Sequence, residues 1–317
     1  MADVVVGVDV GGSAVRAVAV DAELNTAGGM VYIDQTDRSR ESVLENIVQA
    51  VAQAGAGHVV KGVGVAVPAF LRHERGTIEM APNLPELTGW EVQKALEARI
   101  DVPIVLENDA NAGAFGEMSS GVWEGCDPFI YFSLGTGVGG GIIVDGEVMR
   151  GATGLAAELG HITIYPDGAL CGCGDRGCLE AYASATGIVR MFLEATSELS
   201  DSEFKAKYGP RASITGSKLA DLAADGDLHA FESFAQAGRA LGIAVTQMCR
   251  IFDPAAVCLG GRVSRAWSLF WPAMWEEMVA RIPVRLRENL MVQPATLAAT
   301  AGAVGVAGLA WRKVLAA

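Results

Sequence analysis

Apolar runs and amphipathic segments alternate along the first third of the chain. β-Branched runs bounded by glycine predict strands, and apolar residues recurring at the helical period predict helices. In chain order we expect two strands, a helix, a strand, a helix and a strand, over residues 4–8, 15–20, 41–54, 63–67, 90–98 and 104–106. Strands alternating with helices indicate an α/β fold with a mixed or parallel sheet.

The pattern of strand, glycine turn and strand recurs near residue 129. FIYFSLGTGVGGGIIVDGE follows the same plan as VVVGVDVGGSAVRAVAVD, which lies roughly 125 residues earlier. Two such hairpins predict a duplicated fold with two lobes and an active-site cleft between them. Further on we expect helices over 183–251 with a polar break at 197–215, a strand over 256–259 and a last helix over 298–314.

Composition and charge narrow the class of protein. The 317 residues include 24 basic and 37 acidic side chains, and a net charge of −13 disfavours binding to nucleic acid or anionic membranes. No apolar run approaches the roughly 20 residues that span a bilayer. The first residues carry no basic region before their apolar run, so we expect no signal peptide, a cytoplasmic location and reduced cysteines.

Residues 158–180 carry the strongest chemical signal. One histidine and three cysteines fall within eighteen residues and are surrounded by glycines, namely His161, Cys171, Cys173 and Cys178. Three thiolates and one imidazole are a complete tetrahedral zinc set, and a closed set of this kind is structural rather than catalytic. The remaining cysteines are scattered and are interpreted as small buried hydrophobes, namely Cys126, Cys249 and Cys258.

Two glycine turns follow strands and suit phosphate binding, because their backbone N–H groups are unobstructed by side chains. They are Gly11-Gly12-Ser13 and Gly135-Thr136-Gly137, the second of which adds the Thr136 hydroxyl. Asp9 precedes the first turn and could hold Mg²⁺ through water. Neither turn matches the P-loop pattern, and glycine hairpins without ligands are the alternative interpretation.

Glu107-Asn108-Asp109 follows a predicted strand at its C-terminal end, which is the edge where open α/β sheets bind ligands. A carboxylate there can accept a proton from a substrate hydroxyl, and the adjacent amide can hold a neighbouring hydroxyl. The alternative is an aspartate that caps a helix beginning near Ala110.

Glu158, His161 and Glu180 form a further candidate group. Carboxylates and imidazoles are suitable partners for sugar hydroxyls, and Glu158 and His161 point the same way if their segment turns helically. His161 can bind zinc through one nitrogen and present the other to a substrate. A solvated pair of carboxylates is the alternative. Gly260-Gly261, after an apolar strand, would admit an adenine ring or form an ordinary turn.

Together these motifs resemble those of the ROK family (repressors, open reading frames and sugar kinases), most closely its bacterial glucokinases. DVGGS and LGTGVGGGI resemble the family's phosphate motifs, APNLP and ENDANAG its sugar and catalytic-base segments, and LGGRVS the segment near the nucleotide base. ELGH followed by CGCGDRGCLE is the most specific match. The resemblance covers essentially the whole chain.

The resemblance implies a two-lobed actin-like, or ribonuclease-H-like, sugar kinase fold with duplicated βββαβα-type domains. We expect a small lobe of residues 1–115 plus a C-terminal helix at about 300–317, and a large lobe of residues 116–299 with the zinc loop. The implied activity is ATP-dependent phosphorylation of the 6-hydroxyl of glucose in carbohydrate metabolism. The implied cofactors are structural zinc and Mg²⁺ with ATP, and the implied assembly is a homodimer or a homotetramer.

The resemblance also implies a role for each matching residue. Asp109 would be the general base. The other sugar ligands would be Asn83, Asn108, Glu158, His161 and Glu180, and the zinc ligands would be His161, Cys171, Cys173 and Cys178. The nucleotide would lie against Gly11, Gly12, Ser13, Thr136, Gly137, Gly260 and Gly261, with Asp9 near the magnesium.

Two departures and several alternatives stay open at this point. Ser13 stands where the family usually has Thr, and Ala69 follows Pro68 where the family commonly has Gly. N-acetylmannosamine, N-acetylglucosamine, fructose, mannose or allose could replace glucose, and polyphosphate could replace ATP. A sugar-responsive repressor is a remote alternative. Such repressors carry a winged helix-turn-helix ahead of the sugar domain, whereas here we expect the first strand to begin near residue 4. A zinc hydrolase is disfavoured, because four protein ligands leave no position for an activated water.

Overall fold

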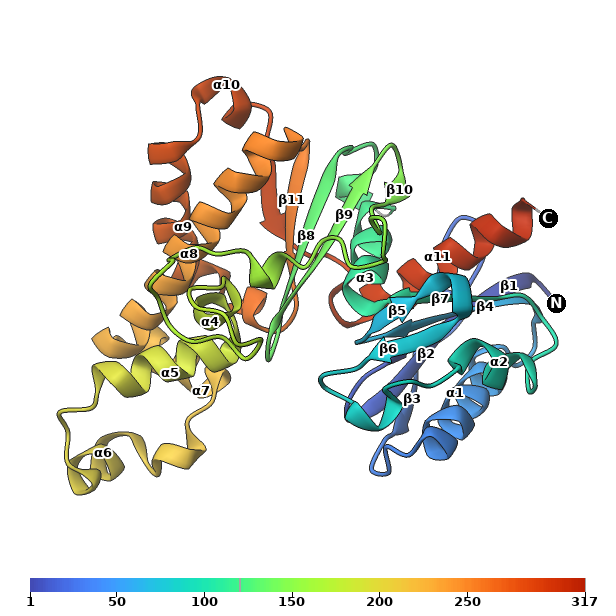
Figure 1. The fold of residues 1–317 in the computed structure, drawn as a ribbon, viewed down its shortest axis with the longest axis horizontal. Helices are drawn as coiled ribbons and strands as arrows, with labels where there is room; N and C mark the ends of the chain where they lie inside the picture. Colours follow the sequence, from blue (N-terminus) through green and yellow to red (C-terminus); the bar gives the residue numbers. More distant parts are fainter. Residues whose placement is uncertain (120, 317) are drawn as a thin grey trace. The chain divides into compact units, whose positions relative to one another are not determined.

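The computed structural model describes residues 1–119 and 121–316 (Figure 1). The chain forms two compact units, which we call unit 1 and unit 2. Unit 1 comprises Met1–Tyr131, Gly141–Ala157 and Thr296–Ala317, and unit 2 comprises Phe132–Gly140 and Glu158–Ala295. Strands β8 and β9 each contribute residues to both units.

A five-stranded mixed sheet in the order β3-β2-β1-β4-β7 forms the centre of unit 1. β1 pairs antiparallel with β2 and parallel with β4, and β4 is parallel to β7. The strands are β1 (Asp3–Val10), β2 (Ala14–Val20), β3 (Val31–Asp34), β4 (Val59–Val67) and β7 (Ile104–Asn108). The helices are α1 (Arg40–Ala54), α2 (Val92–Glu97), α3 (Asp109–Met118) and α11 (Ala301–Leu315), and a hairpin is formed by β5 (Phe70–Arg72) and β6 (Thr77–Met80).

Both faces of this sheet are covered by helices. α1 and its neighbours pack on the face that carries the larger apolar core, while α11 packs against the opposite face, as Figure 1 shows. α11 lies very close to the strands: a Cβ on Gly7 would lie 1.8 Å from the carbonyl oxygen of Ala303, and one on Gly64 would lie 2.2 Å from that of Val306. Strand glycines therefore let the last helix pack directly on the sheet.

A second five-stranded sheet has the order β10-β9-β8-β11-β12. Its strands are β8 (Phe129–Leu134), β9 (Val138–Val144), β10 (Glu147–Val148), β11 (Ala256–Gly260) and β12 (Met291–Pro294). The helices of unit 2 are α4 (Glu180–Ala183), α5 (Ala185–Ala195), α6 (Asp201–Tyr208), α7 (Gly216–Ala224), α8 (Leu228–Phe252), α9 (Trp267–Arg281) and α10 (Val284–Arg287). The longest helix, α8, buries one side along much of its length.

The predicted α/β class is confirmed, and so are the strands and helices expected around the glycine turns. The polar break expected at 197–215 is wrong in part, because α6 lies within it. Ser200 and Glu203 form a capping box, and Phe204 and Tyr208 bury their rings, so a short helix forms despite its polar composition. The elements that the pattern missed are β3, β5, β6, β10, α9, α10 and β12.

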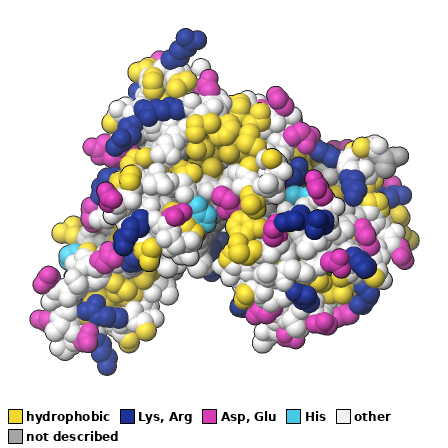
Figure 2. Space-filling view, viewed as in Figure 1, with side chains coloured by type: hydrophobic (Ala, Val, Ile, Leu, Met, Phe, Trp, Pro, Cys, Tyr) yellow, Lys and Arg dark blue, Asp and Glu magenta, His cyan; other side chains and the backbone are white. Residues whose placement is uncertain are grey.

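On the face drawn in Figure 2, acidic and basic side chains are interspersed and the basic ones do not merge into a single stripe. Among residues 1–119 and 121–316, no helix has both the length and the apolar character that a bilayer span requires.

Candidate active site

The first glycine turn joins β1 to β2 and is closed by its own hairpin. The N–H of Gly11 donates to the carbonyl oxygen of Ala14 at 2.9 Å. Gln35, which directly follows β3, supports the turn from outside: its backbone N–H donates to Ser13 and its side-chain Nε2 donates to the carbonyl oxygen of Gly11, both at 2.9 Å. Gln35 is buried, and sequence reasoning missed it.

Asp9 is the penultimate residue of β1, immediately before this turn. Its Oδ2 lies 3.0 Å from a guanidinium nitrogen of Arg16 on the neighbouring strand. Burial raises the pKa of the Asp9 carboxyl, and the charge and hydrogen bond of Arg16 oppose that rise. One carboxylate beside a glycine turn suits Mg²⁺, which keeps several waters and usually meets protein through one or two carboxylates.

Asn108 and Asp109 lie where β7 ends and α3 begins. The capping residue is Asn108, whose Oδ1 accepts from the N–H groups of Ala110 at 2.9 Å and Asn111 at 3.1 Å. The alternative that the aspartate caps the helix is therefore wrong. Asp109 is the first helical residue and its Oδ1 accepts from the N–H of Ala110 at 2.9 Å. The positive end of the helix dipole stabilises a carboxylate at this position.

Glu107 supports this junction from within the core. Its side chain is fully buried and accepts from Nε of Arg150 at 2.8 Å, from the N–H of Asn108 at 3.0 Å and from Nδ2 of Asn111 at 3.1 Å. His73 lies 3.6 Å away through Nε2. Burial lowers the pKa of His73; the negative charge of Glu107 opposes this effect and the positive charge of Arg150 adds to it.

Two further positions of unit 1 come from the sequence analysis: Asn83, a candidate sugar ligand, and Ala69, a departure from the family pattern. Asn83 is exposed in the turn between β6 and the short 3₁₀ helix Pro85–Leu87. Ala69 is buried, and its carbonyl oxygen accepts from Nδ2 of Asn108 at 3.3 Å. The methyl group of Ala69 is thus accommodated, and the residue helps to hold the side chain of Asn108.

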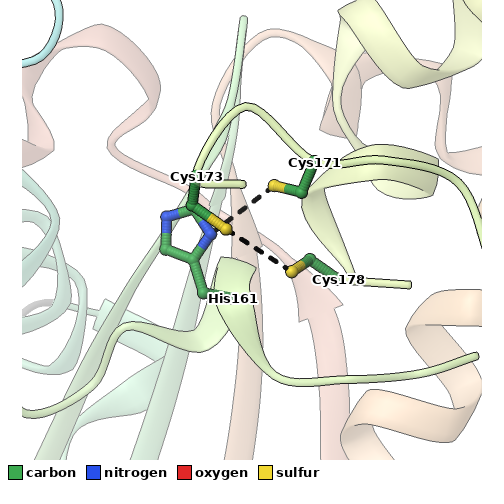
Figure 3. A group of neighbouring side chains, drawn as sticks. All are labelled: His161, Cys171, Cys173 and Cys178. Carbon is green, nitrogen blue, oxygen red and sulfur yellow. Dashed lines mark hydrogen bonds between the residues drawn. The ribbon is translucent and has the colours of Figure 1, made fainter. Parts of the chain in front are cut away.

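In unit 2, the predicted metal ligands converge (Figure 3). The ligand atoms of His161, Cys171, Cys173 and Cys178 all lie within 4.8 Å of one another. Nδ1 of His161 lies 3.7 Å from Sγ of Cys171, and the Sγ atoms of Cys173 and Cys178 are 3.8 Å apart. Tetrahedral zinc with bonds of about 2.3 Å to sulfur requires sulfur atoms about 3.8 Å apart, so the spacing fits zinc.

Burial of two of these thiols affects their protonation. Burial raises the pKa of Cys171 and raises that of Cys178 to about 12, and for Cys178 the hydrogen bonds with the neighbouring thiols add to the rise. Without a cation, the thiols of Cys171 and Cys178 therefore favour the protonated form. A bound metal ion would instead favour the thiolates.

Glycines shape the metal loop. Gly174 and Gly177 have φ values of 100° and 74° in the left-handed region, where glycine is favoured. A Cβ on Gly177 would lie 1.6 Å from the carbonyl oxygen of Tyr165. The loop backbone thus packs against the chain before it. The rings of Tyr165 and Tyr182 meet edge to face with centroids 4.9 Å apart.

Glu158 and His161 lie on one 3₁₀ turn, so the segment does turn helically, which was the condition for the two side chains to point the same way. The N–H of His161 donates to the carbonyl oxygen of Glu158 at 3.0 Å. Burial raises the pKa of Glu158; His161 lowers it and Glu180 raises it, so the three side chains are electrostatically coupled. Glu180 opens α4, and its Oε2 accepts from the N–H of Val138 at 2.9 Å.

The glycine pair 260–261 ends β11. Gly261 has a φ of 81°, and a Cβ there would lie 2.3 Å from the carbonyl oxygen of Leu134. Its own carbonyl oxygen accepts from Oγ of Ser264 at 2.8 Å. The pair therefore forms a tight turn beside β8, the strand that leads into the second glycine turn.

The candidate residues divide between the two units. Unit 1 holds Asp9, Gly11, Gly12, Ser13, Asn83, Asn108 and Asp109, and unit 2 holds Thr136, Gly137, Glu158, His161, Cys171, Cys173, Cys178, Glu180, Gly260 and Gly261. Within its own unit, each set places backbone donors and carboxylates of the kinds that phosphate and sugar chemistry require.

Comparisons with known proteins agree with this picture. The model of the ROK family matches residues 5–313. A glucokinase of Streptomyces coelicolor is 36% identical over 265 residues, which cover 82% of each chain. The crystal structure of a ROK family glucokinase from Streptomyces griseus with glucose and AMPPNP has a TM-score of 0.83 and 35% identity, covering 98% of this chain and 99% of that one. A xylose repressor of Bacillus subtilis is 29% identical over 96% of this chain and 76% of its own length.

Proposed function

The chain belongs to the ROK family, and we propose that it is an ATP-dependent hexose kinase that phosphorylates the 6-hydroxyl of glucose. The observation that carries the proposal is the position of Asp109, which opens α3 at the carboxyl end of a parallel strand with its neighbour Asn108 held in place by Ala69. Glucokinases among the relatives favour glucose as the acceptor.

The proposed chemistry needs little covalent participation from the protein. Asp109 accepts the proton of the 6-hydroxyl as that oxygen attacks the γ-phosphorus of ATP. Asn83 and Asn108 of unit 1, and Glu158, His161 and Glu180 of unit 2, bind the other hydroxyls. The two glycine turns bind phosphate oxygens through backbone N–H groups. Asp9 would hold Mg²⁺ through water, and the ion would supply positive charge to the phosphates.

Zinc has a structural part in this proposal. The four ligands His161, Cys171, Cys173 and Cys178 would hold it, and a closed ligand set leaves no position for a reacting water. His161 would hold the metal through Nδ1, the nitrogen that faces Cys171, and would leave Nε2 for the sugar. Reduced thiols of this kind favour a cytoplasmic enzyme.

The replacement Asp109→Asn tests the proposal. General-base catalysis contributes about 10²- to 10⁴-fold, so kcat for glucose should fall at least about 100-fold. Glucose affinity, measured by calorimetry, should stay within about twofold. The exposed Asp101→Asn, in the same unit, serves as the control and should leave both quantities unchanged. Near-normal turnover in the Asp109 variant would overturn the base assignment.

Other hexoses and polyphosphate are the alternatives within the kinase class, and a sugar-responsive binding protein is the alternative outside it, since a repressor is among the relatives. A coupled assay with each hexose, using ATP and polyphosphate as donors, separates them. Binding of a sugar without turnover on any of them would favour the binding protein. Light scattering after gel filtration tests the expected homodimer.

A further inference from the structure

The second glycine turn is held by the chain that follows the last metal ligand. The N–H of Ala185 donates to the carbonyl oxygen of Gly135, and Oγ1 of Thr186 donates to that of Thr136, both at 2.9 Å. Glu180 accepts from the N–H of Val138 at 2.9 Å. Three residues of the turn region are thus fixed by side chains and backbone from a single segment, residues 180–186.

That segment is joined directly to the metal cluster. Cys178 is separated from Glu180 by one residue, and Sγ of Cys171 lies 3.6 Å from Oε1 of Glu180. The two oxygens of one carboxylate therefore face the cluster on one side and the glycine turn on the other. The N–H of Leu179 donates to the carbonyl oxygen of Ile162 at 3.0 Å, which ties the segment to the residue after His161.

Close packing leaves the turn little room to move independently. A Cβ on Gly137 would lie 2.3 Å from Oε2 of Glu180. On the other side, Gly160 adjoins His161, and a Cβ there would lie 2.0 Å from the carbonyl oxygen of Val138. Chain segments on both sides of the metal cluster thus contact the same turn.

We propose that the segment 178–186 couples the metal cluster to the second phosphate turn, so that metal occupancy sets the affinity for the nucleotide. The proposal rests on the proposed function for the nature of the ligand, ATP. It gives the metal a role on the phosphate side of the site in addition to its role in placing sugar ligands. By reciprocity, nucleotide binding should tighten metal binding by the same factor.

The primary experiment measures AMPPNP binding in the presence of Mg²⁺ by calorimetry. The zinc-loaded full chain is compared with protein stripped by a chelator and then dialysed, with folding checked by circular dichroism. We expect metal removal to weaken AMPPNP binding at least about tenfold. The reason is that the turn would lose the hydrogen bond from the N–H of Val138 to the charged carboxylate of Glu180. Adding zinc back should restore the original affinity.

A variant tests the coupling without changing any candidate metal or sugar ligand. Thr186 is exposed on α5, and Thr186→Val removes only the hydroxyl that donates to Thr136. In zinc-loaded protein we expect AMPPNP binding about threefold weaker, with zinc content and glucose affinity unchanged. Thr186→Ser keeps the hydroxyl and should bind AMPPNP normally.

The outcomes separate the coupling from the proposed function. Failure of zinc-loaded wild-type protein to bind AMPPNP would overturn the assignment of ATP as the ligand. Equal AMPPNP affinity in folded, metal-stripped protein would overturn the coupling and leave ATP as the ligand. If the stripped protein unfolds, the Thr186 pair decides: unchanged AMPPNP affinity in Thr186→Val would overturn the coupling.

Discussion

The two units hold their candidate site residues by different physical means. In unit 1, a buried carboxylate and a buried amide do so through hydrogen bonds: Glu107 supports Asn108, and Gln35 supports the first glycine turn. In unit 2, the corresponding support comes from the loop that carries the candidate metal ligands, with Glu180 between these ligands and the second turn. Two hairpins that share one sequence plan are thus stabilised by unrelated contacts.

This difference implies different sensitivities. A network of carboxylate, guanidinium and imidazole depends on protonation and on the pairing of buried charge. A thiolate–imidazole cluster depends on the supply of metal and on reduced cysteines. The predictions below perturb one support at a time and ask whether the other is affected.

The largest effect is expected at Glu107. Glu107→Gln removes the charge that faces Arg150, whose guanidinium Nε lies 2.8 Å away. Breaking a buried ion pair costs about 3–5 kcal/mol, and since Arg150 is partly exposed we expect about 3 kcal/mol in urea unfolding. Zinc content should not change. The exposed pair of Arg312 and Glu147 provides the control: Glu147→Gln should cost less than about 1 kcal/mol. Equal costs for the two variants would contradict the central role of Glu107.

A smaller effect is expected from adding one methyl group next to the turn of unit 2. Gly160→Ala places a Cβ 2.0 Å from a backbone oxygen that cannot move aside cheaply, and overpacking of this kind costs about 2 kcal/mol. Zinc affinity should fall as well, because His161 is the next residue.

The matched change in unit 1 is Gly12→Ala. No atom lies within 4 Å of a Cβ at that position, so the free energy of unfolding should change by less than about 0.5 kcal/mol. Thermal melts without nucleotide compare the two variants. A destabilised Gly12→Ala beside a normal Gly160→Ala would reverse the comparison between the turns.

The sequence indicated which candidate residues lie close together along the chain. It did not indicate which distant side chains hold them in place. The candidate metal ligands fall within residues 161–178, close together in a glycine-rich stretch, and the glycine turns adjoin their own strands. Supports come from much farther along the chain: Gln35 lies 24 residues from Gly11, and Arg150 lies 43 residues from Glu107. Such contacts depend on how the sheet and helices pack, which periodicity does not encode.

The same reasoning explains the missed elements. α9 begins with three tryptophans spaced four apart, of which Trp267 and Trp271 stack with centroids 4.5 Å apart, but Pro272 interrupts the helical pattern. The short edge strand β3 has only four residues, VYID, in which apolar and polar residues do not alternate clearly. The candidate site motifs could be recognised in the sequence because their residue types and spacing are specific, whereas these elements depend on packing with their neighbours.

A moderate effect is expected when the support of the first turn is removed. Gln35→Leu keeps the volume of the side chain but leaves the carbonyl oxygen of Gly11 without its donor. The free energy of unfolding should fall by only about 1 kcal/mol. The loss is limited because the variant also removes Oε1 of Gln35, which is buried without a hydrogen-bond partner. AMPPNP affinity should fall about fivefold, both with zinc and after zinc removal. Gln53→Leu, at an exposed position of α1, is the control. An effect of Gln35→Leu that disappears in zinc-free protein would show that the two supports are not independent.

A small effect is also expected from pH, through the His73 side chain beside Glu107. Because burial lowers the pKa of His73, the folded state binds a proton less readily than the unfolded state. Stability should therefore fall as the pH drops from about 6.5 towards the lowered folded-state pKa, and be unaffected by this group above that range. His73 is partly exposed, so the loss should stay below about 1 kcal/mol. The difference in unfolding free energy between wild type and His73→Gln, followed from pH 7.5 to 5, measures it, with the exposed His229→Gln in unit 2 as the control. A difference that grows with rising pH would mean that the attraction of Glu107 outweighs burial, and unit 1 would then be stabilised by acid.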